Sequence, residues 1–155
     1  MVSPELLRKY ELFGVLEPEH VNAIAMLSEE RSFEPGANII EADRPADALY
    51  LMMEGSADLL YIGQDEINPK LRKELFISEI NPGEPFGISA LIEPFVYGKT
   101  VRATKTTHVL KVEAAGLRAL CEVDPRITAV LMTQVAKAAL IRLQHTEVQL
   151  GAARV

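Results

Sequence analysis

The residues best suited to chemistry lie close together in the segment 86–103. The segment carries three hydroxyl groups and two cations: Ser89, Tyr97, Thr100, Lys99 and Arg102. If its end is a strand, side chains alternate between the two faces, so at most one of Lys99 and Arg102 points inward. Hydroxyl groups beside a single cation suit the binding of a small polar ligand.

Catalysis and metal binding lack the side chains that they require. The histidines His20, His108 and His145 fall in separate parts of the chain, and Cys121 has no second cysteine. A metal site in a β-roll needs clustered histidines with a carboxylate. Ser89 has no neighbouring base, and no glycine-rich phosphate loop of the known nucleotide-binding types occurs. We therefore expect no enzyme activity, no metal and no cofactor.

Composition narrows the class of protein further. The 155 residues suit a single domain with a core, and the formal net charge is −6. Scattered Lys and Arg residues argue against direct DNA binding, which needs a basic face. No apolar run approaches the roughly 20 residues of a membrane span, and no secretory signal is evident. The lone cysteine fits a reducing compartment. We expect a cytoplasmic protein without a membrane span.

Helical signals occupy both ends of the chain. Ser3 and Pro4 look like an N-cap followed by proline at the first helical position, and a second helix should start near Pro18. After the middle of the chain, residues 114–123 predict a short helix. Asp124 and Pro125 then predict the start of a long helix that runs to about residue 150.

Between these helices, residues 30–113 predict β-structure. Short apolar runs alternate with turn signals: the runs are 38–40, 48–53, 57–62, 75–80, 99–103 and 108–112. The polar segment 63–73 predicts a long exposed hairpin loop. No ten-residue helix separates the runs, which disfavours a parallel sheet. The fold class expected is therefore mainly β with flanking helices (α+β): one domain over residues 1–155, a jelly roll at about 30–113 and C-terminal helices at about 114–150.

Four motifs, taken in order, resemble the cyclic nucleotide-binding domain of the catabolite activator and kinase regulatory-subunit superfamily. The resemblance covers about residues 12–143. The motifs are Leu12-Phe13 with Leu16, Phe33-Glu34-Pro35-Gly36 with Ile39 or Ile40, the stretch from Pro45 to Gly55, and Asn81-Pro82-Gly83-Glu84-Pro85-Phe86-Gly87. The second motif is similar to the family's first strand–turn–strand. The last one matches the entry to the family's phosphate-binding cassette. The resemblance implies that a glutamate directly after the glycine binds the ribose hydroxyl of the nucleotide, and that an arginine balances the negative charge of its phosphate.

Both of these nucleotide-holding positions are changed in this chain. Ile88 stands where the family has glutamate, and Tyr97 stands at the arginine position. Isoleucine accepts no hydrogen bond, and tyrosine is neutral at pH 7. Each lost charge-assisted contact costs about 1.5–3 kcal/mol. We therefore expect cAMP and cGMP to bind weakly or not at all.

The candidate ligand-binding residues follow from the cassette. They are Phe86, Gly87, Ile88, Ser89, Ala90, Leu91, Tyr97, Gly98 and Thr100. Three states of this pocket remain open: side chains that fill it, a rebuilt pocket for a different small molecule, and residual nucleotide binding. An open cavity faced by Ser89 and Thr100 would favour the rebuilt pocket.

Three functions remain possible. The first is a regulatory or signalling module that reports a small-molecule or nucleotide ligand of unknown identity through its C-terminal helices. The second is a structural interaction module with a plugged pocket. The third is a relative of the transcription factors that acts on DNA through a partner, because no recognition helix follows the long helix. The apolar stripe of helix 125–150 would either pack on the roll or form a homodimer.

Overall fold

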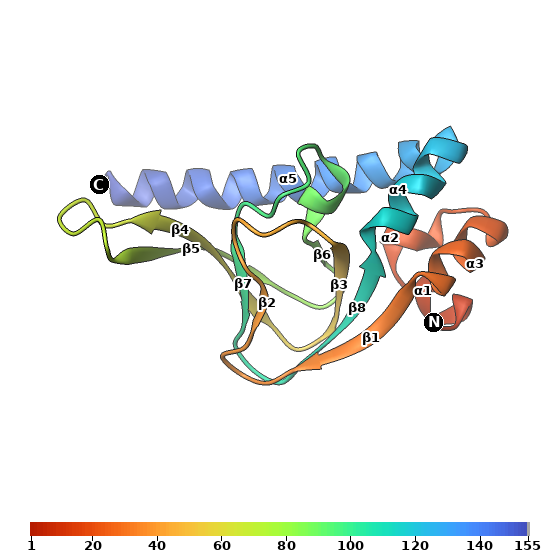
Figure 1. Ribbon diagram of the computed structural model, residues 1–155, viewed down its shortest axis with the longest axis horizontal. Helices are drawn as coiled ribbons and strands as arrows, with labels where there is room; N and C mark the ends of the chain where they lie inside the picture. The colour runs from red at the N-terminus through yellow and green to blue at the C-terminus, as the bar shows by residue number, and fades with distance from the viewer. Residues whose placement is uncertain (155) are drawn as a thin grey trace.

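The computed structural model describes residues 1–154, and it begins with three short helices at one end of the molecule (Figure 1). They are α1 (Pro4–Arg8), α2 (Glu11–Gly14) and α3 (Pro18–Met26). Ser3 caps α1 as predicted, since its side chain accepts a hydrogen bond from the Leu6 amide. Proline occupies the first turn of both α1 and α3, where its missing N–H costs nothing.

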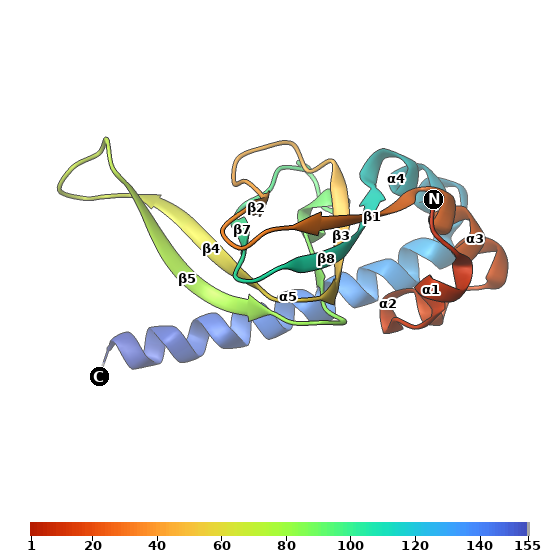
Figure 2. The ribbon, with the colours of Figure 1, turned by 90° about the horizontal axis from the view of Figure 1, so that it is seen from below.

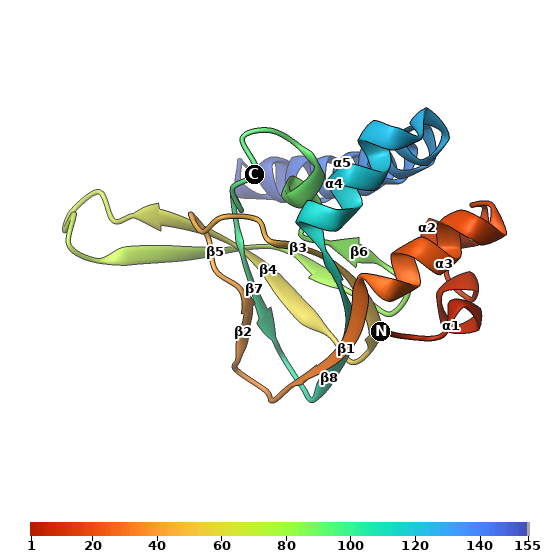
Figure 3. The same cartoon turned by 45° about the vertical axis from the view of Figure 1, so that its right-hand side comes forward.

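Two antiparallel sheets form the centre of the molecule (Figure 3). The strands are β1 (Ser28–Phe33), β2 (Asn38–Ile40), β3 (Ala48–Glu54), β4 (Ala57–Gln64), β5 (Arg72–Ile80), β6 (Pro85–Phe86), β7 (Thr100–Ala103) and β8 (Thr107–Glu113). One sheet has the order β1-β8-β3-β6 and the other β2-β7-β4-β5. Apolar side chains from both sheets fill the space between them, including the Tyr50 and Phe86 rings, which stack at 5.1 Å. The predicted jelly roll with flanking helices is confirmed.

Two strands and one loop differ from the prediction. Strands β1 and β6 were not among the predicted runs, although β1 pairs with β8 along its whole length. The predicted loop 63–73 is shorter, because β4 continues to Gln64 and β5 begins at Arg72. The pairing of Gly63 with Lys73 extends this hairpin beyond the rest of the roll (Figure 2).

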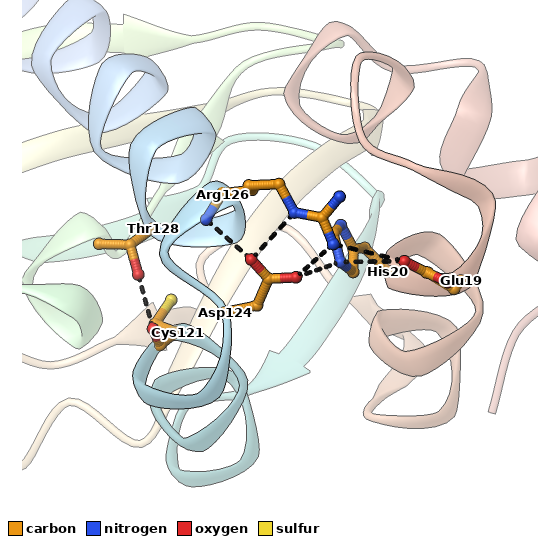
Figure 4. Close-up of polar contacts among 6 residues, drawn as sticks. All are labelled: Glu19, His20, Cys121, Asp124, Arg126 and Thr128. Atoms are coloured by element: carbon orange, nitrogen blue, oxygen red, sulfur yellow. Dashed lines mark hydrogen bonds and ion pairs between the residues drawn. The ribbon is translucent and has the colours of Figure 1, made fainter.

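The chain then forms α4 (Ala114–Val123) and α5 (Pro125–Ala153), which meet at Asp124. The Asp124 carboxylate caps α5 by accepting a hydrogen bond from the Arg126 amide. It also lies 2.7 Å from His20 Nε2 on α3 and 2.8 Å from Arg126 Nη2 (Figure 4). Hydrogen bonds from Arg126, and then one from His20, hold the pKa of Asp124 well below its usual range. His20 is buried where α3 meets the start of α5.

Helix α5 runs along the roll (Figures 1 and 2). The two halves of this helix differ in the burial of their apolar side chains. The first half buries Ile127, Leu131, Val135 and Ala138. The second half leaves larger apolar side chains exposed: Leu140, Ile141, Leu143, Val148 and Leu150. Its end still touches the β4–β5 hairpin, since Gln149 donates a hydrogen bond to the Ile77 carbonyl. Of the helices within residues 1–154, none is long and apolar enough to cross a membrane.

Candidate functional site

A small cavity of about 140 Å³ opens beside the predicted cassette. Its walls come from the β2-β7-β4-β5 sheet, from the short 3₁₀ helix η1 (Ile88–Leu91), from the residues just before β7 and from α5. The lining residues are Ile40, Leu59, Gly87, Ile88, Ser89, Tyr97, Gly98, Lys99, Val101 and Arg142. The space beside Ile88 and Tyr97 is therefore not completely filled.

The turn into η1 requires glycine at position 87. Gly87 has φ +70°, a conformation that side chains disfavour. A Cβ atom there would lie 3.0 Å from Ile40 Cδ1 and 3.2 Å from the Ala48 carbonyl oxygen. Glycine thus lets the chain pass close against β3 and places Ile88 and Ser89 in the cavity wall.

The Tyr97 side chain makes its polar contacts with β3. Its hydroxyl donates a hydrogen bond to the Ala48 carbonyl at 2.6 Å and accepts one from the Ala48 amide at 3.2 Å. Burial, and then nearby Tyr50 and Asp47, raise the pKa of the phenol, although the Ala48 bond opposes them. The phenol is therefore neutral at physiological pH, and its donor is already used.

Ile88 and Ser89 give the cavity one apolar wall and one hydroxyl group. Ile88 packs partly against the core and supplies no hydrogen-bonding atom. The Ser89 side chain lines the cavity and makes no hydrogen bond to the part of the chain that the structure describes. Its hydroxyl is thus available to a ligand.

Two cations line the same cavity. Lys99 immediately precedes β7, and Arg142 reaches in from α5, where its Nη2 atom donates to the Pro85 carbonyl at 2.6 Å. Burial lowers the pKa of Lys99, and the charge of Arg142 adds to the effect. Burial also lowers the pKa of Arg142, against the opposing charge of Glu84. The cavity therefore has positive charge, but not from the position expected in the family.

The alternation along β7 separates the remaining polar residues from the cavity. Arg102 points away and binds both Glu74 carboxylate oxygens, at 2.7 and 2.9 Å. Thr100 also lies outside the lining, because its hydroxyl accepts a hydrogen bond from the Ala42 amide. Lys99 is the member of the predicted pair that lines the cavity.

The structure brings together five of the nine candidate residues. Gly87, Ile88, Ser89, Tyr97 and Gly98 line the cavity. The other four lie behind it: Phe86 and Ala90 are buried in the core, Leu91 packs against the core and Thr100 bonds to Ala42. Thr100 in the cavity wall was thus a wrong expectation, and Arg142 and the apolar residues Ile40, Leu59 and Val101 were missed.

Arg118 on α4 positions the cassette, a role that none of the sequence motifs indicates. Its guanidinium donates hydrogen bonds to the Ala90 carbonyl at 2.8 Å and to the Ala46 carbonyl at 2.7 Å. It also stacks 3.9 Å from the centre of the Phe95 ring. A lone cation among the apolar residues of α4 is the only signal that the sequence offers. Arg118 thereby joins η1 to the C-terminal helices.

No group of three or more His, Cys, Asp or Glu residues within positions 1–154 could hold a metal ion. His108 bonds to Ser32, and His145 lines a separate cavity against α5. The cavity instead offers the Ser89 hydroxyl and the Lys99 and Arg142 cations, which suit an anionic or polar ligand.

Comparison with known proteins identifies the chain's relatives. Residues 30–124 match the family model of the cyclic nucleotide-binding domain. A crystal structure from Geobacter metallireducens, named a "putative cyclic nucleotide-binding protein", is 38% identical with a TM-score of 0.80, covering 92% of this chain and 99% of that one. The sensor domain of the transcriptional regulator DNR from Pseudomonas aeruginosa shares the fold, with a TM-score of 0.70 at 16% identity over 90% of each chain.

One of the curated relatives is a larger protein. The chain is 28% identical to a cyclic nucleotide-gated potassium channel of Mesorhizobium japonicum over 126 residues. These residues make up 81% of this chain and 32% of the channel. The chain spans about a third of the length of the curated relatives it matches.

Proposed function

The chain belongs to the cyclic nucleotide-binding domain family, and from this we propose that it is a regulatory module whose cavity senses a ligand other than cAMP or cGMP. The observation that carries the proposal is the Tyr97 phenol. It occupies the position at which the family resemblance expects an arginine, and its hydroxyl is held by the Ala48 amide and carbonyl, with Asp47 Oδ1 as a further acceptor at 3.4 Å. A neutral group whose donor is already used cannot balance a cyclic phosphate.

Ile88 strengthens the same argument at the ribose position. Its side chain lines the cavity and cannot accept a hydrogen bond from a hydroxyl. Two lost charge-assisted contacts, at about 1.5–3 kcal/mol each, lower affinity by about 100-fold or more. The cavity of about 140 Å³ is also smaller than the roughly 300–1,000 Å³ typical of pockets that enclose larger ligands.

A regulatory role requires that the ligand bind one arrangement of the molecule better than another. Arg118 connects the η1 carbonyl of Ala90 to α4, and Arg142 connects the cavity to α5. A change at the cavity therefore reaches both C-terminal helices through direct contacts. This is the physical basis on which the module would report its ligand to a partner.

The test compares the natural protein with the double variant Ile88→Glu and Tyr97→Arg. Each is melted with and without cAMP and cGMP, since a ligand at 100 times its Kd stabilises by about 2.7 kcal/mol. We expect a shift for the double variant and none for the natural protein. The variant Tyr61→Arg, at a half-exposed strand position, controls for added charge. A clear shift of the natural protein with cAMP would overturn the proposal.

A second candidate is an interaction module, which the exposed apolar side chains of α5 favour. Leu143 is 52% and Val148 72% exposed on the outer half of this helix. Contact with a second copy through helix 125–150, or with a DNA-binding partner, would cover them. Light scattering of the natural protein and of Leu143→Glu tests the homodimer, because a buried carboxylate at the contact would disfavour it. An unchanged monomeric mass for both would exclude the dimer.

A further inference from the structure

Two cations meet at one cavity whose lining contains no carboxylate. Lys99 comes from the start of β7 and Arg142 from α5, 43 positions later. Neither forms an ion pair within residues 1–154, whereas Arg31, Arg102 and Arg126 each do. Charges kept together in this way, partly shielded from water, cost free energy unless an anion joins them.

We propose that this cavity binds a small oxyanion, the phosphate or carboxylate group of a small molecule, between Lys99 and Arg142. The C-terminal helix then supplies the positive charge that the cassette position 97 lacks. This inference rests on the proposed function, because it names the chemistry of the ligand that the module would sense.

The guanidinium of Arg142 is well placed for this role. Its bond from Nη2 to the Pro85 carbonyl fixes the group at the cavity and leaves its other donors free. The opposing charge that acts on it is that of Glu84, and this carboxylate accepts a hydrogen bond from the Asn81 amide. A planar guanidinium with free donors can bind two oxygens of a phosphate or carboxylate.

The rest of the lining fits a small anion. The Ser89 hydroxyl is a further donor, and Ile40, Leu59 and Val101 form an apolar wall. Such a wall keeps the local dielectric low, which strengthens a charged contact. Burial lowers the pKa of both cations, and the charge of Arg142 lowers the pKa of Lys99 further. The volume of about 140 Å³ matches an oxyanion group with a short organic part.

Binding at this place would also fix α5 against the roll. Arg142 is the cavity residue contributed by α5, and Pro85 anchors it beside β6. An anion that bridges Lys99 and Arg142 adds a second link between β7 and α5. The ligand would therefore favour the docked position of the helix, which is the differential binding that a sensor needs.

The experiment titrates the full chain with inorganic phosphate, succinate and ribose 5-phosphate at constant ionic strength. Amide NMR shifts of Gly87, Ser89 and Gly98 report binding at the cavity. We expect saturable shifts with at least one probe. Tighter binding of succinate than of inorganic phosphate would identify a carboxylate ligand. Tighter binding of ribose 5-phosphate than of inorganic phosphate would identify an organic phosphate. Absence of saturable shifts with all three would overturn the proposal.

Variants Arg142→Gln and Lys99→Gln test the two cations separately. Each is expected to weaken binding by about 10- to 100-fold, the loss of one charge-assisted contact. Lys137→Gln is the matched control on the same helix, because Lys137 pairs with Glu11 on the surface. Arg102→Gln is the control on the outer face of β7. Affinity that is unchanged in both cavity variants, or equally reduced in the controls, would refute the assignment.

The two proposals fail in different ways. If the probes do not bind and cAMP does not bind either, the oxyanion site is wrong and the loss of nucleotide recognition stands. If cAMP binds tightly and Lys99 and Arg142 are required, the loss of nucleotide recognition is wrong and the oxyanion site stands.

Discussion

Replacing Tyr97 by phenylalanine removes a single oxygen from the protein and should destabilise it measurably. That oxygen pairs with both the carbonyl and the amide of Ala48, which is fully buried. A buried polar group left unpaired costs about 1–3 kcal/mol. The carbonyl loses a bond of 2.6 Å, while the amide loses a longer one of 3.2 Å, so the carbonyl dominates. We expect a loss of about 2 kcal/mol.

Thermal and chemical denaturation measure this loss directly. For a chain of this size, about 2 kcal/mol corresponds to a Tm lower by about 4–8 °C. Tyr61→Phe is the matched control, because Tyr61 is 48% exposed and should change little. A Tyr97→Phe protein whose Tm stays within about 1 °C of the natural one would refute the claim that the phenol supports β3. It would also reopen the possibility that the hydroxyl serves a ligand.

Three further outcomes are expected. Arg118→Met should lower the free energy of unfolding by about 1.5–3 kcal/mol, because the carbonyls of Ala90 and Ala46 lose a charged donor. It should also speed amide hydrogen exchange in η1, and unchanged exchange would contradict the positioning role of Arg118. Asp124→Asn keeps a good N-cap but removes the charge that His20 and Arg126 contact, so urea denaturation should show lower stability at pH 7. Because the pKa of Asp124 is lowered by folding, its contribution is present above the ordinary carboxylate pKa and is lost as the pH falls, so the two proteins should converge in acid. Burial, and then Asp47, raise the pKa of Tyr50 to about 12. The contribution of this raised pKa to the free energy of unfolding is therefore complete below about pH 10 and is lost as the pH rises through 12, by up to about 1.4 kcal/mol per pH unit. Denaturation at pH 9 and 11 should show a smaller loss of stability for Tyr50→Phe than for the natural protein.

The fold followed from local patterns wherever a strand had an apolar face. Strand β3 was predicted because its residues are almost all buried. No apolar run marks strand β1, because Glu29, Glu30, Arg31 and Ser32 are exposed and the ladder with β8 makes them a strand. Strand β6 has just two residues and exists through its pairing with Tyr50 and Leu51. Tertiary pairing of this kind leaves no period in the sequence.

The candidate site was predictable to the extent that it is local. Gly87 and the residues that follow it could be placed, since a turn and a short helix are encoded within a few positions. Strand alternation predicted that at most one of Lys99 and Arg102 points inward, and Lys99 is the one that lines the cavity. Arg142 could not be found, because its place in the cavity depends on how α5 lies against Pro85. The direction of the Tyr97 hydroxyl depends likewise on the backbone of Ala48.

The length of α5 gives its junction with α4 mechanical leverage. At about 1.5 Å per residue, the helix from Pro125 to Ala153 measures about 43 Å. A tilt of about 5° at Asp124 would therefore carry its far end about 4 Å sideways. Because the Gln149 side chain donates a hydrogen bond to Ile77 on β5, the β4–β5 hairpin would move together with that end of the helix. Small adjustments deep in the roll would thus be magnified at the tip farthest from the N-terminal helices.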